Sequence, residues 1–290
     1  MKLAALKPSA LLVSAMLVLS ACSAGALNLV TSRSGYERIA DLPYGEGERR
    51  RLDLYVPDGA TATTPVVVFF HGGSWDSGDK GIYRFLGQAV TAEGFIVAVP
   101  NYRLYPETTF PGFVEDGAAA MRAVETLLRE GTSGLPAGEH PLLLMGHSAG
   151  AQIAALLAFD ERYLAAAGTT RERIAGFVGL SGPYDFLPLD EERYKRIFPE
   201  PTRPQSQPIN FADAGGPPTL LLHGLADTTV KPSNTRAMGQ AIVDAGGRAE
   251  TRFFEGVDHI TPIASFATAL PIGEAAIPQA VFEFLRANAR

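Results

Sequence analysis

The sequence has few of the residues that build disulfides, metal sites or nucleic-acid surfaces. Its only cysteine is Cys22, which excludes an internal disulfide and a cysteine-based zinc site. No two of its five histidines stand four residues apart, so the helical spacing of a zinc-binding histidine pair is absent. Lysine and arginine form no block and the formal net charge is −6, which argues against nucleic acid as a partner. These absences predict a protein without metal or cofactor.

No apolar run in the sequence has the length of about 20 residues that a transmembrane helix needs. The N-terminus instead has the layout of an export signal. Lys2 and Lys7 precede an apolar run over residues 9–19, and small residues follow it. This order is typical of a secretory signal peptide, and the run is too short for a comfortable transmembrane helix. The alternative, a buried N-terminal helix, leaves the order of charge, apolar run and small residues unexplained.

The end of this signal, Leu19-Ser20-Ala21-Cys22, resembles the lipobox of bacterial lipoproteins. The resemblance implies that residues 1–21 are removed and that Cys22 carries lipid, which tethers the exported protein to a membrane on the non-cytoplasmic face of the cell envelope. Residues 22–40 are expected to form the tether, and residues 41–290 the catalytic domain. An ordinary cleavage site beside a free thiol is the alternative.

The rest of the chain alternates between buried-strand and helix patterns, and a hydrophobic content of 46% over 290 residues is enough for one sizeable core. Continuous apolar runs suit strands buried on both faces and lie at 65–70, 95–99, 141–145, 175–180 and 218–222. Helical spacing occurs at 112–130, 149–158, 233–245 and 276–288. An alternating strand at 52–56 suits an antiparallel edge. The pattern predicts an α/β fold with a mostly parallel, doubly wound sheet, whose sites lie at the carboxyl ends of strands.

A candidate nucleophile lies at one such strand end. Gly146-His147-Ser148-Ala149-Gly150 fits the G-x-S-x-G pattern and stands between a predicted strand and a predicted helix, the setting that this motif requires. The sharp turn needs residues without side chains two before and two after the serine, and glycine occupies both places. Ser148 is therefore the predicted nucleophile.

Two further features complete a candidate acyl-transfer site. The N–H of Ala149 follows the nucleophile and is a predicted oxyanion donor, with a partner expected in the glycine-rich loop 71–75. His259 follows the alternating run 251–254 and is the predicted general base. Asp227 follows the strand 218–222 and is the predicted acid.

Other titratable residues near these positions are expected to be structural. Asp258 adjoins His259 and cannot easily fold back onto it, and Asp185 precedes the last strands. His71 and His223 both follow strand ends and are expected to be satisfied inside the core.

Seven motifs together resemble the α/β-hydrolase carboxylesterases, with hormone-sensitive-lipase-like and feruloyl/acetyl-esterase-like enzymes as the nearest groups. The resemblance covers about residues 45–288 and rests on HGGSW at 71–75, YRLYPE at 102–107, FPGFVED at 110–116, GHSAG at 146–150, SGPYD at 181–185, HGLAD at 223–227 and VDH at 257–259.

The resemblance implies an α/β-hydrolase fold that cleaves short-acyl or aryl carboxylic esters. Its catalytic residues would be Ser148, Asp227 and His259, and its oxyanion hole would be formed by Gly73, Ser74 and Ala149. Tyr102–Leu104 would be structural, with Arg103 and Asp116 in a support network.

The chain departs from the lipase-like pattern at Ser74, which replaces a third glycine, and at His147, which replaces an acidic residue. Both departures point to the feruloyl/acetyl-esterase-like and formamidase-like branches. Residues 186–216 are expected to form a short cap over the site. Trp75 either limits acyl length or packs in the core.

Other functions remain open on the sequence. After the esterase, the second hypothesis for the function is an arylformamidase-like amidase. The third is an exopeptidase, although such exopeptidases usually carry a large N-terminal domain. A non-catalytic surface lipoprotein is the rival from another class, but it should lack one of the three catalytic residues. The sequence leaves the natural ester and the oligomeric state open.

Overall fold

The structure contains the mostly parallel sheet that the apolar runs predict. The structure is a computed structural model that describes residues 27–132, 134–270 and 272–289; the predicted export signal and Cys22 lie outside them. In this part of the chain, eight strands pair in the order β1-β2-β4-β3-β5-β6-β7-β8. They are β1 (Tyr36–Pro43), β2 (Arg51–Pro57), β3 (Val66–Phe70), β4 (Ile96–Pro100), β5 (Leu142–His147), β6 (Ile174–Leu180), β7 (Thr219–Gly224) and β8 (Ala249–Phe254).

Among the described strands, only those at the N-terminal edge of the sheet pair antiparallel. β2 pairs antiparallel with both β1 and β4, and every other neighbouring pair is parallel. Parallel strands need crossover connections, so their carboxyl ends, and the loops that follow them, gather at one edge. This places the loops after β3, β5, β6, β7 and β8 together.

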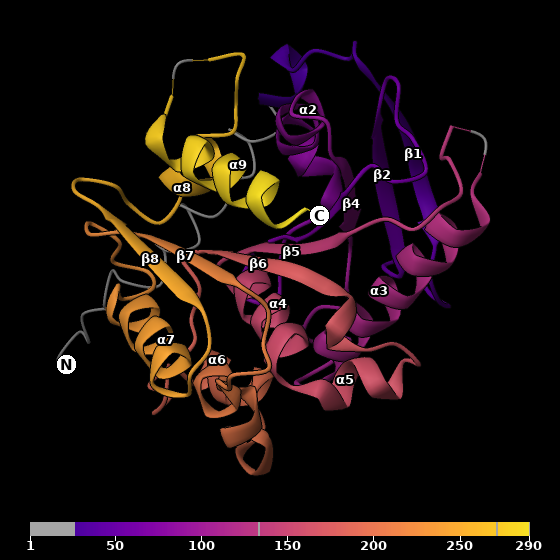
Figure 1. Ribbon diagram of the computed structural model, residues 1–290. Coiled ribbons are helices and arrows are strands. Elements are labelled where there is room, and N and C mark those ends of the chain that lie inside the picture. The colour runs from indigo at the N-terminus through magenta and orange to yellow at the C-terminus, as the bar shows by residue number, and fades with distance from the viewer. Residues whose placement is uncertain (1–26, 133, 271, 290) are drawn as a thin grey trace, which may run out of the picture.

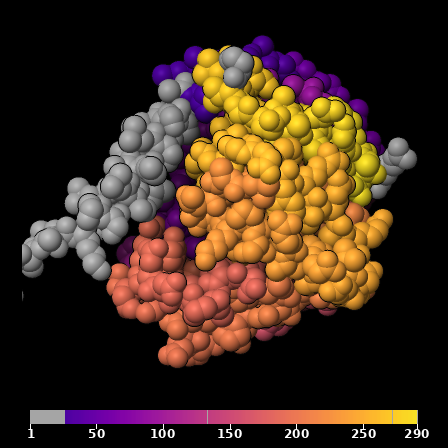
Figure 2. All heavy atoms as spheres, turned by 90° about the vertical axis from the view of Figure 1, so that its left-hand side faces the viewer, coloured from indigo at the N-terminus to yellow at the C-terminus, as the bar shows by residue number. Residues whose placement is uncertain are grey.

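Helices cover both faces of the sheet (Figure 1). One face carries α2 (Arg84–Ala92), α8 (Thr261–Ala264) and α9 (Ala276–Asn288), and the other carries α3 (Gly112–Glu130), α4 (Ala149–Phe159), α5 (Glu161–Ala166), α6 (Glu192–Ile197) and α7 (Ser233–Asp244). Figure 2 shows that the last third of the chain covers much of the face that it views. No helix in the described ranges is long and apolar enough to span a membrane.

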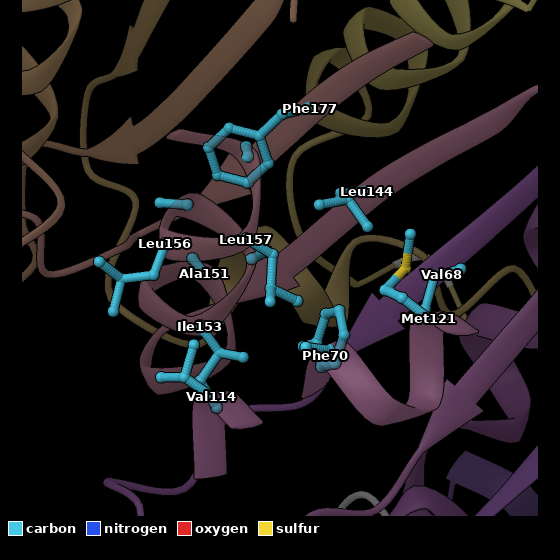
Figure 3. Close-up of a cluster of buried hydrophobic side chains, with 14 of the residues drawn as sticks. Val68, Phe70, Val114, Met121, Leu144, Ala151, Ile153, Leu156, Leu157 and Phe177 are labelled. Atoms are coloured by element: carbon cyan, nitrogen blue, oxygen red, sulfur yellow. The ribbon is translucent and has the colours of Figure 1, made fainter. Parts of the chain in front are cut away.

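Two apolar clusters hold these layers together, one on each side of the sheet. On the α4 side, alternate residues of β3 and β5 pack against α3 and α4, as Figure 3 shows for Phe70, Leu144, Ile153 and Leu157. Every residue of α4 is buried. Because the helix that carries the nucleophile motif has no solvent face, its N-terminus has a fixed position against the sheet.

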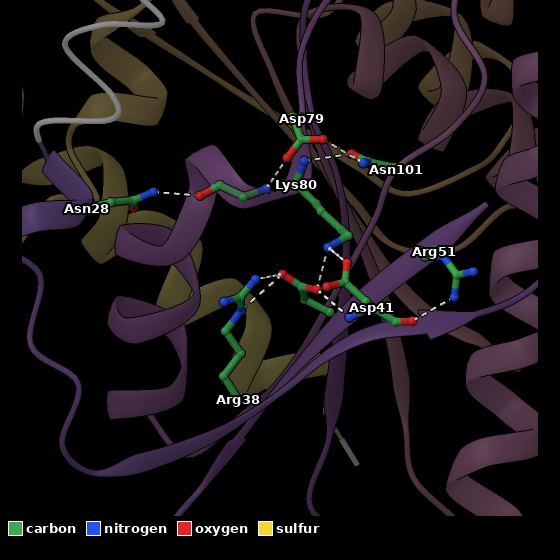
Figure 4. A network of polar contacts seen from close by, with 9 residues as sticks. Asn28, Arg38, Asp41, Arg51, Asp79, Lys80 and Asn101 are labelled. Carbon is green, nitrogen blue, oxygen red and sulfur yellow. Dashed lines mark hydrogen bonds and ion pairs between the residues drawn. The ribbon is translucent and has the colours of Figure 1, made fainter. Parts of the chain in front are cut away.

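A buried cation joins the antiparallel edge to the segment before α2 (Figure 4). Lys80 Nζ lies 2.6 Å from a carboxylate oxygen of Asp53 and 2.6 Å from one of Asp41. Asp53 has no exposed side-chain surface and also accepts from Arg38. A buried carboxylate needs such partners, so this cluster fixes the start of the domain.

The domain begins earlier than the sequence predicted. β1 starts at Tyr36, inside the stretch 22–40 that was expected to be a tether, and pairs with β2 through residue 43. Residues 27–30 are helical. β1 is largely polar and half exposed, so it lacks the apolar signature of a strand, and its pairing with β2 supplies the backbone hydrogen bonds that define it.

Candidate active site

The predicted nucleophile lies on a strained turn between β5 and α4. Ser148 has φ 53° and ψ −124°, a conformation that non-glycine residues adopt at a cost of about 1–3 kcal/mol. A Cβ at Gly146 would lie 2.4 Å from the carbonyl oxygen of Gly150, and one at Gly150 would lie 2.0 Å from that of Phe70. Both glycines of the motif are therefore sterically required, as the sequence predicted.

The structure brings Ser148, His259 and Asp227 into one hydrogen-bonded row. His259 Nε2 lies 2.9 Å from Ser148 Oγ, and His259 Nδ1 lies 2.7 Å from Asp227 Oδ2. The three residues come from the loops after β5, β8 and β7. Because the Asp227 carboxylate accepts a hydrogen bond from the Nδ1–H group of His259, the neutral imidazole has its free lone pair on Nε2, which faces the hydroxyl of Ser148.

Four donors hold the Asp227 carboxylate. Oδ1 accepts the backbone N–H groups of Thr229 and Val230, both at 2.9 Å. Oδ2 faces His259 and, at 3.1 Å, Nε2 of the fully buried His223. Burial alone would raise the pKa of Asp227, but hydrogen bonds from His223 and His259 outweigh it and lower this pKa well below the usual carboxyl range. Asp227 is therefore ionised throughout the neutral range.

The rival carboxylates have other surroundings. Asp258 Oδ1 accepts the N–H groups of Ile260 and Thr261 and the hydroxyl of Thr261, so it closes the turn that leads into the short helix α8. Asp185 is exposed, and its backbone N–H donates to Asn234. Neither carboxylate has a hydrogen bond to His259.

The loop after β3 lies against the nucleophile turn. A Cβ at Gly72 would be 3.1 Å from Ser148 Cβ, so a larger residue there would crowd the turn that carries Ser148. Gly73, Ser74 and Trp75 follow with φ values of 129°, 52° and 61°. Three successive positive φ values, two of them at residues with side chains, make this loop a strained segment.

The three predicted oxyanion donors are the backbone N–H groups of Gly73, Ser74 and Ala149. In the described chain, the N–H groups of Gly73, Ser74 and Ala149 donate to no backbone carbonyl. Ala149 is the first residue of α4, where N–H groups lack intrahelical acceptors and carry the positive end of the helix dipole. Ala149 thus offers a donor beside Ser148 to a developing negative charge.

Three histidines near the site have buried positions. His71 stacks on Tyr102 with ring centroids 4.4 Å apart, and burial lowers its pKa to about 4. His223 Nδ1 contacts the hydroxyl of Thr235 at 2.7 Å. His147 is one residue before Ser148, and its ring lies 5.1 Å from the His259 ring. Burial, together with the nearby His259, lowers the pKa of His147 to about 3.

The predicted support network is also present, because Arg103 and Asp116 pair at 2.9 Å.

The segment 186–216 docks on the loop after β3. Arg193 pairs with Asp76, and the rings of Phe186 and Phe198 lie 5.7 and 4.8 Å from that of Trp75. Trp75 is only 5% exposed. Of the two roles that the sequence left open for Trp75, packing is the one that the contacts support.

Gln152 is a residue near the site that the sequence reasoning missed. It stands one helical turn after Ser148 and is fully buried. Its side-chain amide accepts from Trp75 and donates to Ser206. The helical spacing identifies its face of α4, but the arrival of two distant loops there is visible only in the structure. No cluster of three metal-binding side chains occurs in the described residues.

The eight-stranded sheet and the loops at its carboxyl edge define an α/β-hydrolase fold. Residues 52–242 match the model of the BD-FAE family, and the chain belongs to this family. Esterase B from Lactobacillus Rhamnosis has the same fold, with a TM-score of 0.77 at 19% identity over 95% of this chain and 92% of that one.

Two curated proteins show how far the similarity extends in sequence. A probable isoprenylcysteine alpha-carbonyl methylesterase ICME from Oryza sativa subsp. japonica is 32% identical over 238 residues, 74% of this chain and 56% of the relative. A kynurenine formamidase from Danio rerio is 31% identical over 162 residues, 54% of this chain and 50% of the relative. The chain spans about half the length of these curated relatives.

Proposed function

We propose that the protein is a serine hydrolase that cleaves small carboxylic esters. The observation that carries the proposal is the row of hydrogen bonds from Ser148 Oγ through His259 to Asp227, with distances of 2.9 and 2.7 Å. Membership in the BD-FAE family and the similarity to a probable methylesterase support the ester as substrate.

The arrangement supplies each step of acyl transfer. Ser148 Oγ attacks the ester carbonyl while His259 Nε2 takes its proton, and Asp227 stabilises the imidazolium that forms. The N–H groups of Gly73, Ser74 and Ala149 stabilise the oxyanion. His259 then protonates the leaving alcohol, and the same residues activate a water molecule that releases the acid from the acyl-enzyme.

The test is covalent labelling followed by a substrate comparison. A fluorophosphonate should label the wild type at Ser148, and Ser148→Ala should lose both the label and ester hydrolysis while it stays folded. Turnover of Ser148→Ala above about one thousandth of the wild type would contradict the proposed nucleophile. Absence of labelling in a folded wild type would favour a non-catalytic lipoprotein.

An amidase acting on N-formyl aryl amides is the second candidate, because the chain is 31% identical to a kynurenine formamidase over 162 residues. A comparison of acetyl, butyryl and feruloyl esters with a formyl anilide separates the two activities. If the protein is an esterase, its highest kcat/KM in this comparison should be on an ester. A higher kcat/KM on the formyl anilide would mean that the protein is an amidase instead.

We also propose that the protein is exported and anchored through lipid on Cys22, on the non-cytoplasmic side of a membrane. The lipobox-like sequence Leu19–Cys22 supports this localisation, and only four residues separate Cys22 from Leu27, where the described fold begins.

A further inference from the structure

A single buried amide joins three parts of the candidate site. Gln152 lies in α4, and its backbone N–H donates to the carbonyl of Ser148 at 3.3 Å. Its Oε1 accepts from the Trp75 indole nitrogen at 3.0 Å, and its Nε2 donates to the carbonyl of Ser206 at 2.8 Å. The nucleophile helix, the loop after β3 and the segment 186–216 therefore meet at one side chain.

The chemistry of both contacts fits a neutral amide. The indole N–H can only donate and the Ser206 carbonyl can only accept, so the linking group needs an acceptor at one end and a donor at the other. Gln152 has no exposed surface, so either partner would be left buried without a hydrogen bond if the amide were removed.

The loop that Gln152 contacts needs external support. Gly73, Ser74 and Trp75 all have positive φ, and such conformations persist only where the surroundings over-determine them. Trp75 attaches this loop to its surroundings: its ring packs against Phe113, Phe186 and Phe198. Its one polar atom is the nitrogen that donates to Gln152.

We propose that Gln152 is a positioning residue that fixes Trp75 and thereby the N–H groups of Gly73 and Ser74 at the oxyanion. This inference rests on the proposed function, in which those N–H groups stabilise the transition state. Loss of one oxyanion donor costs about 10²–10³ in kcat. A displaced donor retains part of its effect, so we expect removal of the Gln152 amide to lower kcat about 10- to 100-fold with little change in KM.

The central variant is Gln152→Met, which keeps the length of the side chain and removes both hydrogen bonds. Its kcat on a p-nitrophenyl ester should fall as stated, its KM should stay within about threefold, and its fluorophosphonate labelling should slow in proportion. Trp75→Phe removes the same hydrogen bond by deleting its donor, the indole N–H. The double variant should lose much less kcat than the product of the two single losses, because the bond is already gone.

A matched control is Gln207→Met. Gln207 is a second buried glutamine, whose Oε1 accepts the N–H of Phe186 and whose Nε2 donates to Ser206 Oγ. It lies inside the segment 186–216 and has no hydrogen bond to Trp75 or α4. Its replacement should lower Tm and change KM, with kcat close to that of the wild type. Equal kcat for Gln152→Met and the wild type would overturn the inference.

Hydrogen exchange of residues 71–78 gives a readout that does not need turnover. Exchange in this loop should be faster in Gln152→Met than in the wild type and unchanged in Gln207→Met. Unchanged exchange in Gln152→Met would overturn the positioning role even if the protein proved inactive on esters. A wild type that neither hydrolyses esters nor reacts with fluorophosphonate would instead refute the proposed function. If Gln152→Met does not fold, Trp75→Phe is measured in the same way, and wild-type exchange there would refute the role.

Discussion

The imidazole of His147 donates its Nε2–H to the backbone carbonyl of His259 at 2.9 Å. The residue before the proposed nucleophile therefore holds the loop of the proposed base. Because a carbonyl only accepts, His147 carries its proton on Nε2, and its buried Nδ1 has no hydrogen-bond partner among the described residues. A second proton would have to enter this buried ring beside His259, so His147 stays neutral at neutral pH.

This burial predicts that acid destabilises the protein well above the carboxyl range. In the unfolded chain His147 binds a proton below about pH 6.5, whereas in the folded protein its pKa is about 3. The unfolded state therefore binds more protons between these values, and stability falls as the pH falls. From pH 7 to 5.5 the loss from one such histidine is about 1 kcal/mol, and buried His71 adds to it in the same direction.

Urea unfolding at pH 7 and 5.5 measures this effect. His147→Gln, which keeps a donor near the His259 carbonyl, should lose about 1 kcal/mol less on acidification than the wild type. Asp227 does not contribute to the difference between pH 7 and 5.5. Folding lowers its pKa, so its contribution to the free energy of unfolding is fully present above about pH 3.9 and is lost only below that pH. An identical loss in His147→Gln and the wild type would show that His147 is protonated in the folded state.

The two carboxylates near His259 should differ strongly in their effect on catalysis. Asp227→Asn removes the charge that faces His259 Nδ1 at 2.7 Å and favours the wrong tautomer, which costs up to about 10⁴ in kcat in a serine protease. Asp258→Asn changes only the turn before α8, where the Asn side-chain oxygen can still accept, and should lower kcat by less than about tenfold. The reverse ranking in steady-state kinetics would assign the acid to Asp258.

Local signals and strand order account for what could be predicted from the sequence. The turn at residues 146–150 could be predicted from its motif, because the steric demand on Gly146 comes from Gly150 within the same five residues, although the demand on Gly150 comes from Phe70 on β3. His259 and Asp227 could be placed because each follows a buried or alternating strand in a parallel sheet. Gln152 could not be identified in this way, because its partners Trp75 and Ser206 lie 77 and 54 residues away.

Weakly apolar elements could not be predicted from the sequence either. β1 takes its structure from pairing with β2 and from the contacts of Arg38 and Asp41 with Asp53. None of these produces a hydrophobic period in the sequence. The single-residue conformations at Ser74 and Trp75 are likewise set by tertiary contacts, since neither residue favours positive φ.

Lipid attachment at Cys22 is tested directly by mass spectrometry of the mature protein from membranes. We expect a chain that begins at Cys22, with the mass of a diacylglycerol thioether and, usually, one further acyl chain. Cys22→Ala should release the protein from the membrane fraction, because several acyl chains hold far more firmly than other surface contacts. A free thiol, or a mature N-terminus at another residue, would refute the anchor.

Acyl preference is the last prediction, and it follows from how the segment 186–216 is attached. Ser148 is 8% exposed and the His259 side chain 11%, so access to the reacting atoms is narrow. The segment is fixed by the Arg193–Asp76 pair and by the rings of Phe186 and Phe198 around Trp75. A lid that opens for long chains would have to break this packing, so short acyl esters should be preferred.

A series of p-nitrophenyl esters from two to twelve carbons measures this preference. Each methylene changes transition-state binding by about 1–3 kcal/mol at most, so kcat/KM should fall gradually beyond the shortest chains. Arg193→Met frees the segment from Asp76 and should shift the optimum to longer chains, because the cost of opening falls. Lys195→Met is the control, since its exposed pair with Glu192 lies within α6 and holds nothing across the site. The short-acyl prediction would be wrong if wild-type kcat/KM peaked at ten carbons or more and activity jumped at an oil–water interface. The segment would then open readily despite these contacts, and the protein would be a lipase and not a short-acyl esterase.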